Sequence, residues 1–228
     1  MWGSSTEKEV KTVVVIDVKG DIISNDDKWV YDWFEWDSTC PNDVKNALIN
    51  AEPGEEIEVH VNSGGGSVMA GQEMYSLLRG NPNVTIVIQS MAGSAAGVVA
   101  MAGKNKISPV AMVMIHNVSM HGASGDYHDM QKNAEILKQM NASMAAAYTE
   151  KSGKSQEEIL RLMDKETWLT ANQCLEYGFV DEIIKEEKSE SYFTNSYSGM
   201  RLTDELRERA VQEKAKQELL KDLDFYGV

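Results

Sequence analysis

The sequence predicts an α/β fold in which strands and helices alternate in layers. Short β-branched runs recur through the first half of the chain, glycine-containing turns follow several of them, and stretches with apolar residues at helical spacing lie between. The chain has 228 residues, which corresponds to one large domain or to one domain with an appendage. A chain of this length can bury a full core without disulfides or a structural metal.

Strand and helix patterns alternate up to about residue 115. Apolar or alternating runs predict strands at 13–18, 57–61, 84–88 and 111–115. Apolar residues at helical spacing predict helices at 43–51, 68–79 and 94–102. These helices end at a Pro53-Gly54 turn, at Gly80 and at Gly103. The aromatic segment 29–36 is compatible with a helix or with irregular structure.

A helical period dominates from Asp126 onward. One apolar face continues over about six turns, and Asp126 is its candidate N-cap. Capping boxes predict two further helices, one from Ser155 with Glu158 and one from Thr170 with Gln173. The last of these helices should end at Gly178, before a short strand at 179–184.

The two ends of the chain have a different character. We expect residues 1–11 to form a flexible N-terminal segment. Residues 186–228 read as a polar linker followed by a charged helical tail, which is exposed, docked on a partner or folded only in an assembly.

Composition narrows the class of partner. Lys and Arg number 22 against 36 Asp and Glu, so the formal net charge is −14, and binding to nucleic acid or to an anionic membrane is not expected. No run of about 18 apolar residues predicts a membrane span, and the polar N-terminus does not look like a signal peptide. Cys40 and Cys174 form no CxxC pattern, which favours a reducing compartment, and we expect a cytoplasmic protein without metal or cofactor.

The glycine run Gly64-Gly65-Gly66 is the first candidate functional element. Glycines accept positive φ and allow a ligand to approach the backbone, and their amides can point at an oxyanion. A tight turn between strand and helix is the simpler explanation of the run taken alone. No Gly-Lys-Ser/Thr follows, so a nucleotide-binding P-loop is excluded.

Ser94 and His116 are the second and third candidates. Ser94 stands among small residues at the start of a predicted helix, where it is either a nucleophile or a simple N-cap. His116 directly follows the strand 111–115 and could be the base for a serine nucleophile, with His121, His128 and His60 as alternatives. The histidines show no HExxH pattern, so a metal site is disfavoured, and the missing GxSxG elbow disfavours an α/β-hydrolase.

Five ordered motifs together resemble the proteolytic subunit of the Clp protease, a family of serine peptidases, over about residues 12–185. The motifs are 61–66, the segment around Ser94, 114–117, 166–171 and 176–183. The resemblance looks closest to the Clp-like head maturation, or prohead, proteases of tailed phages and prophages. It implies a repeated β-β-α spiral shared with crotonases, a protruding helical handle, and a domain at 12–185.

The resemblance also implies roles for single residues. Ser94 would be the nucleophile and His116 the general base, with Glu166 as the third member and Asp164 as the fallback. Glu166 stands where the housekeeping enzyme has Asp. The amides of Gly66 and Ala95 would form the oxyanion hole. The remaining residues expected to contact substrate are Gly64, Gly65, Ser67 and Asn117.

The implied activity is hydrolysis of peptide bonds through an acyl-enzyme, with phage capsid or scaffold protein as substrate. The expected assembly is a homo-oligomer of heptameric rings that can stack. Departures from the housekeeping pattern, such as Gly64 in place of proline, favour the phage branch. The alternatives are a housekeeping-type subunit that works with an ATPase unfoldase, and an inactive capsid-associated protein with the same fold. A crotonase-type enzyme needs no Ser-His pair and is disfavoured.

Overall fold

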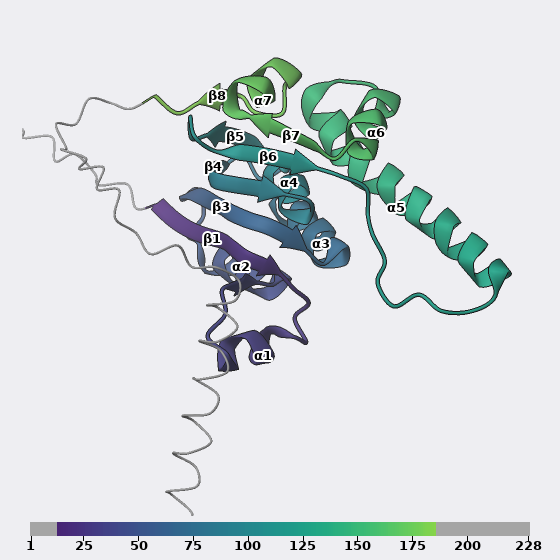
Figure 1. Ribbon diagram of the computed structural model, residues 1–228. Helices are drawn as coiled ribbons and strands as arrows, with labels where there is room; N and C mark the ends of the chain where they lie inside the picture. Colours follow the sequence, from purple (N-terminus) through teal and green to yellow (C-terminus); the bar gives the residue numbers. More distant parts are fainter. Residues whose placement is uncertain (1–12, 186–228) are drawn as a thin grey trace, which may run out of the picture. The chain divides into compact units, whose positions relative to one another are not determined.

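The computed structural model describes residues 13–185, and the expectations for 1–11 and 186–228 fall outside the described residues. The described strands are β1 (Val13–Ile22), β2 (Ser38–Thr39), β3 (Glu56–Gly66), β4 (Val84–Gly93), β5 (Lys104–Ile107), β6 (Met112–Ile115), β7 (Thr167–Thr170) and β8 (Glu182–Ile183). The described helices are α1 (Lys28–Trp33), α2 (Pro41–Asn50), α3 (Val68–Leu78), α4 (Ala95–Ala100), α5 (Tyr127–Ser152), α6 (Gln156–Asp164) and α7 (Ala171–Tyr177). The predicted α/β class is confirmed (Figure 1).

The sheet is parallel in the order β2-β1-β3-β4-β5-β8, and β6 adds to it by pairing with β4 in parallel and with β7 antiparallel. Strand β4 changes partner along its length. Its first part pairs with β5 through Thr85–Ile88, and its last residues, Met91–Gly93, pair with β6. The end of β4 and the end of β6 therefore lie next to each other, and the two segments that follow them start from neighbouring positions.

The glycine run differs from its prediction. Gly64-Gly65-Gly66 is not a tight loop but the last part of β3, where Asp21 pairs with Gly65 and Ile22 with Gly66. The register shifts between Val61 and Ser63 on the β4 side and between Lys19 and Asp21 on β1. Irregular pairing of this kind needs residues that accept unusual φ, and Gly65 and Gly66 have φ of 106° and 147°.

Helices α2, α3 and α4 lie along one face of the sheet (Figure 1). Strand residues alternate between buried and exposed positions in β1 and β3, with the buried side chains directed at these helices. Helix α4 is buried along its whole length because its residues are small and apolar. Glycines permit this close packing, since a Cβ at Gly71 of α3 would lie 2.9 Å from the Ala95 Cβ.

Helix α5 corresponds to the expected handle. Asp126 caps it as predicted, because its side chain accepts hydrogen bonds from the amides of His128 and Asp129. Its first half extends away from the sheet (Figure 1), and burial begins only near Met144. Only the C-terminal part of this helix therefore belongs to the core.

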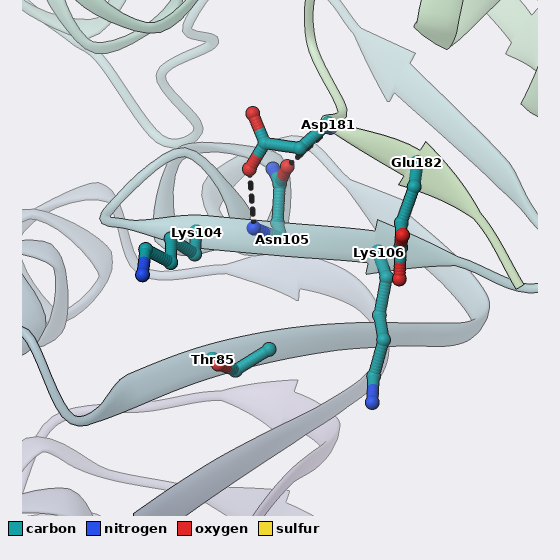
Figure 2. Close-up of a pocket in the computed structure, with 6 residues that line it drawn as sticks. All are labelled: Thr85, Lys104, Asn105, Lys106, Asp181 and Glu182. Carbon is teal, nitrogen blue, oxygen red and sulfur yellow. Dashed lines mark hydrogen bonds between the residues drawn. The ribbon is translucent and has the colours of Figure 1, made fainter.

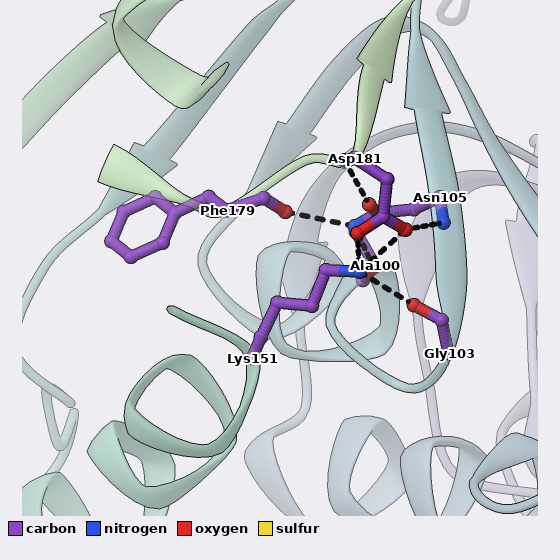
Figure 3. Close-up of polar contacts among 6 residues, drawn as sticks. All are labelled: Ala100, Gly103, Asn105, Lys151, Phe179 and Asp181. Atoms are coloured by element: carbon purple, nitrogen blue, oxygen red, sulfur yellow. Dashed lines mark hydrogen bonds and ion pairs between the residues drawn. The ribbon is translucent and has the colours of Figure 1, made fainter. Parts of the chain in front are cut away.

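A polar anchor holds the C-terminal end of α5 against the sheet (Figure 3). The Lys151 ammonium donates to the Asp181 carboxylate at 2.7 Å and to the Gly103 carbonyl at 3.0 Å. Buried Asn105 donates its side-chain amide to the carbonyls of Ala100 and Phe179, each at 2.8 Å. Three segments that are far apart in the sequence are thereby joined: the end of α5, the start of β5 and the turn after α7.

Candidate active site

Ser94 stands between the end of β4 and the first residue of α4. Its backbone has φ 52° and ψ −121°, a left-handed conformation that is rare for a residue with a side chain. The Ser94 amide donates to the Met114 carbonyl at 2.9 Å, which joins the strand end to β6. Its side chain accepts no capping hydrogen bond, so Ser94 is not a simple N-cap. The turn leaves the hydroxyl half-buried and free to face a neighbouring residue.

His116 is that neighbour. It directly follows β6, and its Nε2 lies 2.8 Å from the Ser94 Oγ. In the tautomer with the proton on Nδ1, the Ser94 hydroxyl donates to Nε2, which is the arrangement of a nucleophile and its general base. The pairing of Met91–Gly93 with Met112–Met114 explains the contact, because it aligns the ends of β4 and β6. His60 lies in β3, where it contacts Glu58, and His121 and His128 are exposed before and within α5.

The end of β3 forms one wall beside Ser94. A Cβ placed on Gly65 would lie 2.7 Å from the Ser94 Cβ and 3.0 Å from the Ala95 nitrogen. A Cβ on Gly66 would instead meet the Ile22 carbonyl oxygen of β1, and one on Gly93 would lie 2.9 Å from the Gly64 carbonyl oxygen. The absence of side chains is thus what allows the β3 backbone to reach the serine. Close approach of a ligand to the glycine run stays a prediction.

Two amides beside Ser94 differ in their availability. Ala95 is the first residue of α4, and within residues 13–185 its amide has no acceptor, as expected at a helix N-terminus. The Gly65 amide donates to the Ser63 hydroxyl at 3.1 Å, and that hydroxyl donates to the Gly20 carbonyl at 2.6 Å. Ser63 was not among the predicted site residues, although its buried side chain holds the glycine strand in place. The oxyanion role of Gly66 stays a prediction.

Ser67 and Asn117, both expected to contact substrate, have structural partners. Ser67 caps α3 by accepting from the Ala70 amide at 3.4 Å, and its own amide donates to the Ile22 carbonyl at 2.7 Å. Asn117 donates its side-chain amide to an Asp164 oxygen at 2.8 Å, while its own Oδ1 is buried without a partner in the described structure. The next amide, of Val118, donates to Asn141 of α5 at 2.7 Å. The segment after His116 is therefore clamped by α5 and α6.

The third member of the proposed triad is not in contact with the histidine. Glu166 is exposed, has φ 47°, and accepts at 3.3 Å from the indole nitrogen of Trp168. Asp164 is exposed and engaged with Asn117. Among the described residues, neither carboxylate is hydrogen-bonded to His116. Within residues 13–185, the structure brings the serine and the histidine together but places neither of the two predicted carboxylates in contact with the histidine.

A separate recess of about 530 Å³ lies over β4, β5 and β8 (Figure 2). It is lined by Thr85, Lys104, Asn105, Lys106, Asp181 and Glu182. No predicted site residue is among them, and the recess is at the start of β4, whereas Ser94 follows its end. Asn105 and Asp181 also belong to the polar anchor of α5. We therefore regard the Ser94 region, and not this recess, as the candidate active site.

Residues 13–185 contain no group of three or more His, Cys, Asp or Glu side chains arranged to hold a metal ion. No helix among them has the length and apolarity needed to cross a membrane.

Comparison with known proteins assigns the family. Residues 35–187 match the Clp protease family. The chain is 35% identical over 158 residues to ATP-dependent Clp protease proteolytic subunit 2 of Tropheryma whipplei, which covers 66% of this chain and 87% of that protein. It is 33% identical over 159 residues to proteolytic subunit 1 of Corynebacterium glutamicum, with 67% and 76% covered, and 32% identical over 141 residues to the proteolytic subunit of Bacteroides fragilis, with 60% and 68% covered. The chain therefore belongs to the Clp protease family, which implies serine-type peptidase activity.

Proposed function

We propose that this chain is a Clp-type proteolytic subunit that hydrolyses peptide bonds through an acyl-enzyme on Ser94. The observation that supports this most directly is the 2.8 Å contact between Ser94 Oγ and His116 Nε2, at a serine with φ 52°. A strained turn that presents a hydroxyl to a histidine has no evident structural purpose, since Ser94 caps no helix amide.

The proposed reaction follows from this geometry. Ser94 Oγ adds to the carbonyl carbon of the scissile peptide while its proton passes to His116 Nε2. The carbonyl oxygen becomes an oxyanion, which the unpaired Ala95 amide stabilises together with the proposed Gly66 amide, each donor being worth about 3 kcal/mol. His116 then protonates the leaving amine as the C–N bond breaks. Water, deprotonated by the same histidine, hydrolyses the ester and restores the Ser94 hydroxyl.

Glu166 is the proposed third member, with the role of orienting His116 and stabilising its protonated form. Its carboxylate is exposed, and its Trp168 contact of 3.3 Å is long, so little opposes a change of rotamer towards the histidine. Asp164 is the weaker choice because its carboxylate already accepts from Asn117 at 2.8 Å.

The wider role is proposed from the relatives. They are named as proteolytic subunits of ATP-dependent Clp proteases, which favours a housekeeping-type subunit that receives substrate from an ATPase partner. We propose that the chain acts as a homo-oligomeric ring in the cytoplasm. Rings of seven, stacking of rings, and a role in phage prohead maturation stay predictions from the sequence, and the relatives do not support the phage role.

Labelling with a fluorophosphonate tests the proposed nucleophile. The full-length protein should be labelled at Ser94, and both Ser94→Ala and His116→Ala should lose labelling. Thr85→Ala, which changes a hydroxyl in the recess at the other end of β4, is the control and should label normally. An assembled, folded wild-type sample that takes no label would contradict the proposal.

A further inference from the structure

Helix α1 buries none of its residues, which is unusual for a helix of a folded domain. Trp29 and Trp33 are 66% and 71% exposed and lie four residues apart, on the same side of the helix. Phe34 and Trp36, directly after the helix, are also exposed. We call these four residues the aromatic surface.

Three of the four rings, those of Trp33, Phe34 and Trp36, contact one another. The centroids of Trp33 and Phe34 are 5.2 Å apart, and those of Phe34 and Trp36 are 4.9 Å apart in a stacked arrangement. Tyr31 meets Trp36 edge-on at 5.8 Å. Aromatic residues gathered in this way at a surface are typical of binding sites, where tryptophan contributes more than most residues.

Acidic residues are frequent in the segment that carries the rings. Segment 21–37 contains six acidic residues and one lysine, a formal net charge of −5. The lysine, Lys28, is paired with Asp32, and that hydrogen bond raises its pKa. Asp26 and Asp37 are exposed, and neither has an ion-pair partner in the described part of the chain. We call Asp26, Asp27, Asp32, Glu35 and Asp37 the acidic rim.

The chain holds this surface at the end of β1. Both ends of the segment are tied to the strand, since the Asp21 amide donates to the Asp37 carbonyl at 3.1 Å and the Ile23 amide to the Thr39 carbonyl at 3.0 Å. Ile22, the last residue of β1, pairs with Gly66 at the end of the strand that lies beside Ser94. Figure 1 shows α1 beyond β1, at one edge of the sheet. Backbone hydrogen bonds therefore fix the position of the aromatic surface at the end of β1.

We propose that the aromatic surface and its acidic rim bind a segment of another polypeptide that carries arginine or lysine beside apolar side chains. Aromatic faces attract cations, and the exposed carboxylates of Asp26 and Asp37 in the same segment add to the attraction. A second copy of this chain is a poorer fit to the rim, because the chain has only 22 Lys and Arg against 36 Asp and Glu. The proposal concerns binding and does not depend on the peptidase reaction.

Peptide binding tests the proposal. The probe is a short fluorescein-labelled peptide of alternating arginine and leucine, compared with one in which glutamate replaces arginine. Full-length protein carrying Ser94→Ala is used, so that the probe is not consumed. We expect the arginine peptide to bind and the glutamate peptide to bind at least about tenfold more weakly. Trp33→Ala should weaken binding of the arginine peptide about tenfold, and Asp26→Asn or Asp37→Asn about threefold, with the charge effects lost at high salt.

Matched controls lie on other elements. Val110→Ala removes an apolar side chain that is 87% exposed between β5 and β6, and Glu176→Gln removes an exposed charge on α7. Both variants should bind like the parent. Equal binding of the two peptides, or parental binding by Trp33→Ala, would overturn the proposal. So would a Trp33→Ala protein whose assembly dissociates in light scattering while its peptide binding is unchanged, because the surface would then serve self-association.

Discussion

The backbone of Ser94 is strained at the residue that carries the proposed chemistry. With φ 52° and ψ −121°, it lies in a region that costs a residue with a Cβ about 1–3 kcal/mol. The register of β4 with β6 and the close approach of Gly65 leave it no ordinary alternative. The strain turns the hydroxyl towards His116.

We predict that Ser94→Gly is more stable than Ser94→Ala by about 1 kcal/mol, although both lack the nucleophile. Glycine relieves the strain, whereas alanine keeps it. The difference should appear in denaturant unfolding of the two proteins at equal concentration. Equal stability, or a more stable alanine variant, would mean that the turn is relaxed.

Glu166 and Asp164 can be separated by peptidase rate. If Glu166 orients His116 during catalysis, Glu166→Gln should lower the peptidase rate strongly, because the imidazole loses the carboxylate that orients it and stabilises its protonated form. Asp164→Asn should lower the rate less, because Asp164 acts on the segment after His116 only through Asn117. Equal rates for the two variants would refute this assignment.

At the scale of elements, the division of β4 between two partners builds the site. The first part of β4, Thr85–Ile88, pairs with β5, and its last part, Met91–Gly93, pairs with β6, so two different strands lie along the same side of β4. The polar anchor at Asn105 holds the start of β5 to the end of α4 and to the turn after α7 (Figure 3). The position of β5 in the sheet therefore depends on polar contacts as well as on apolar packing.

Asn105→Ala should destabilise the protein by about 2–3 kcal/mol, because it leaves the carbonyls of Ala100 and Phe179 buried without their donor. Thermal or denaturant unfolding measures the loss. Asn172→Ala, on an exposed position of α7, is the control and should be close to neutral. A neutral Asn105→Ala would show that solvent replaces the lost hydrogen bonds.

Elements with strong patterns were predictable, and short ones were not. The strands at 13–18, 57–61 and 84–88 and the capped helices have clear periods, and the structure contains them all. Strand β5, Lys-Asn-Lys-Ile, was not predicted because three of its four residues are polar, and only the sheet places them in register. Strands β2 and β7 were also missed, and the strand expected at 179–184 is only Glu182–Ile183, since Phe179 and Val180 are buried in the preceding turn.

At the scale of the whole molecule, residues 13–185 expose apolar side chains on α5 that a monomer would leave in contact with water. The first half of α5 is exposed and includes Tyr127, Met130 and Ile136 among its apolar side chains. Exposed apolar side chains on an extended helix indicate contact with other subunits. The Clp protease family forms oligomeric rings, which agrees with this indication.

We predict that light scattering finds an assembly larger than the 25.4 kDa monomer. Ile136→Glu should shift the protein to smaller species and lower the peptidase rate in parallel, since it places a charge in the expected contact. Leu175→Glu makes the same chemical change on α7, at a side chain that is 44% exposed, and should leave the assembly intact. A fully assembled Ile136→Glu protein would contradict a role for this face of α5.

The sequence by itself determined the α/β class, the main strands and helices, and the family, because these depend on local periodicity and on motifs in a fixed order. It also singled out Ser94 and His116 as candidate site residues, since the residue types and the small neighbours of the serine are local properties. Only the tertiary structure decided that these two side chains meet at 2.8 Å, that the glycine run is the end of a strand, and that Ser67 and Asn117 have structural partners. These facts depend on the pairing of β4 with β6 and of β1 with β3, which join residues far apart in the chain. No local pattern specifies such contacts.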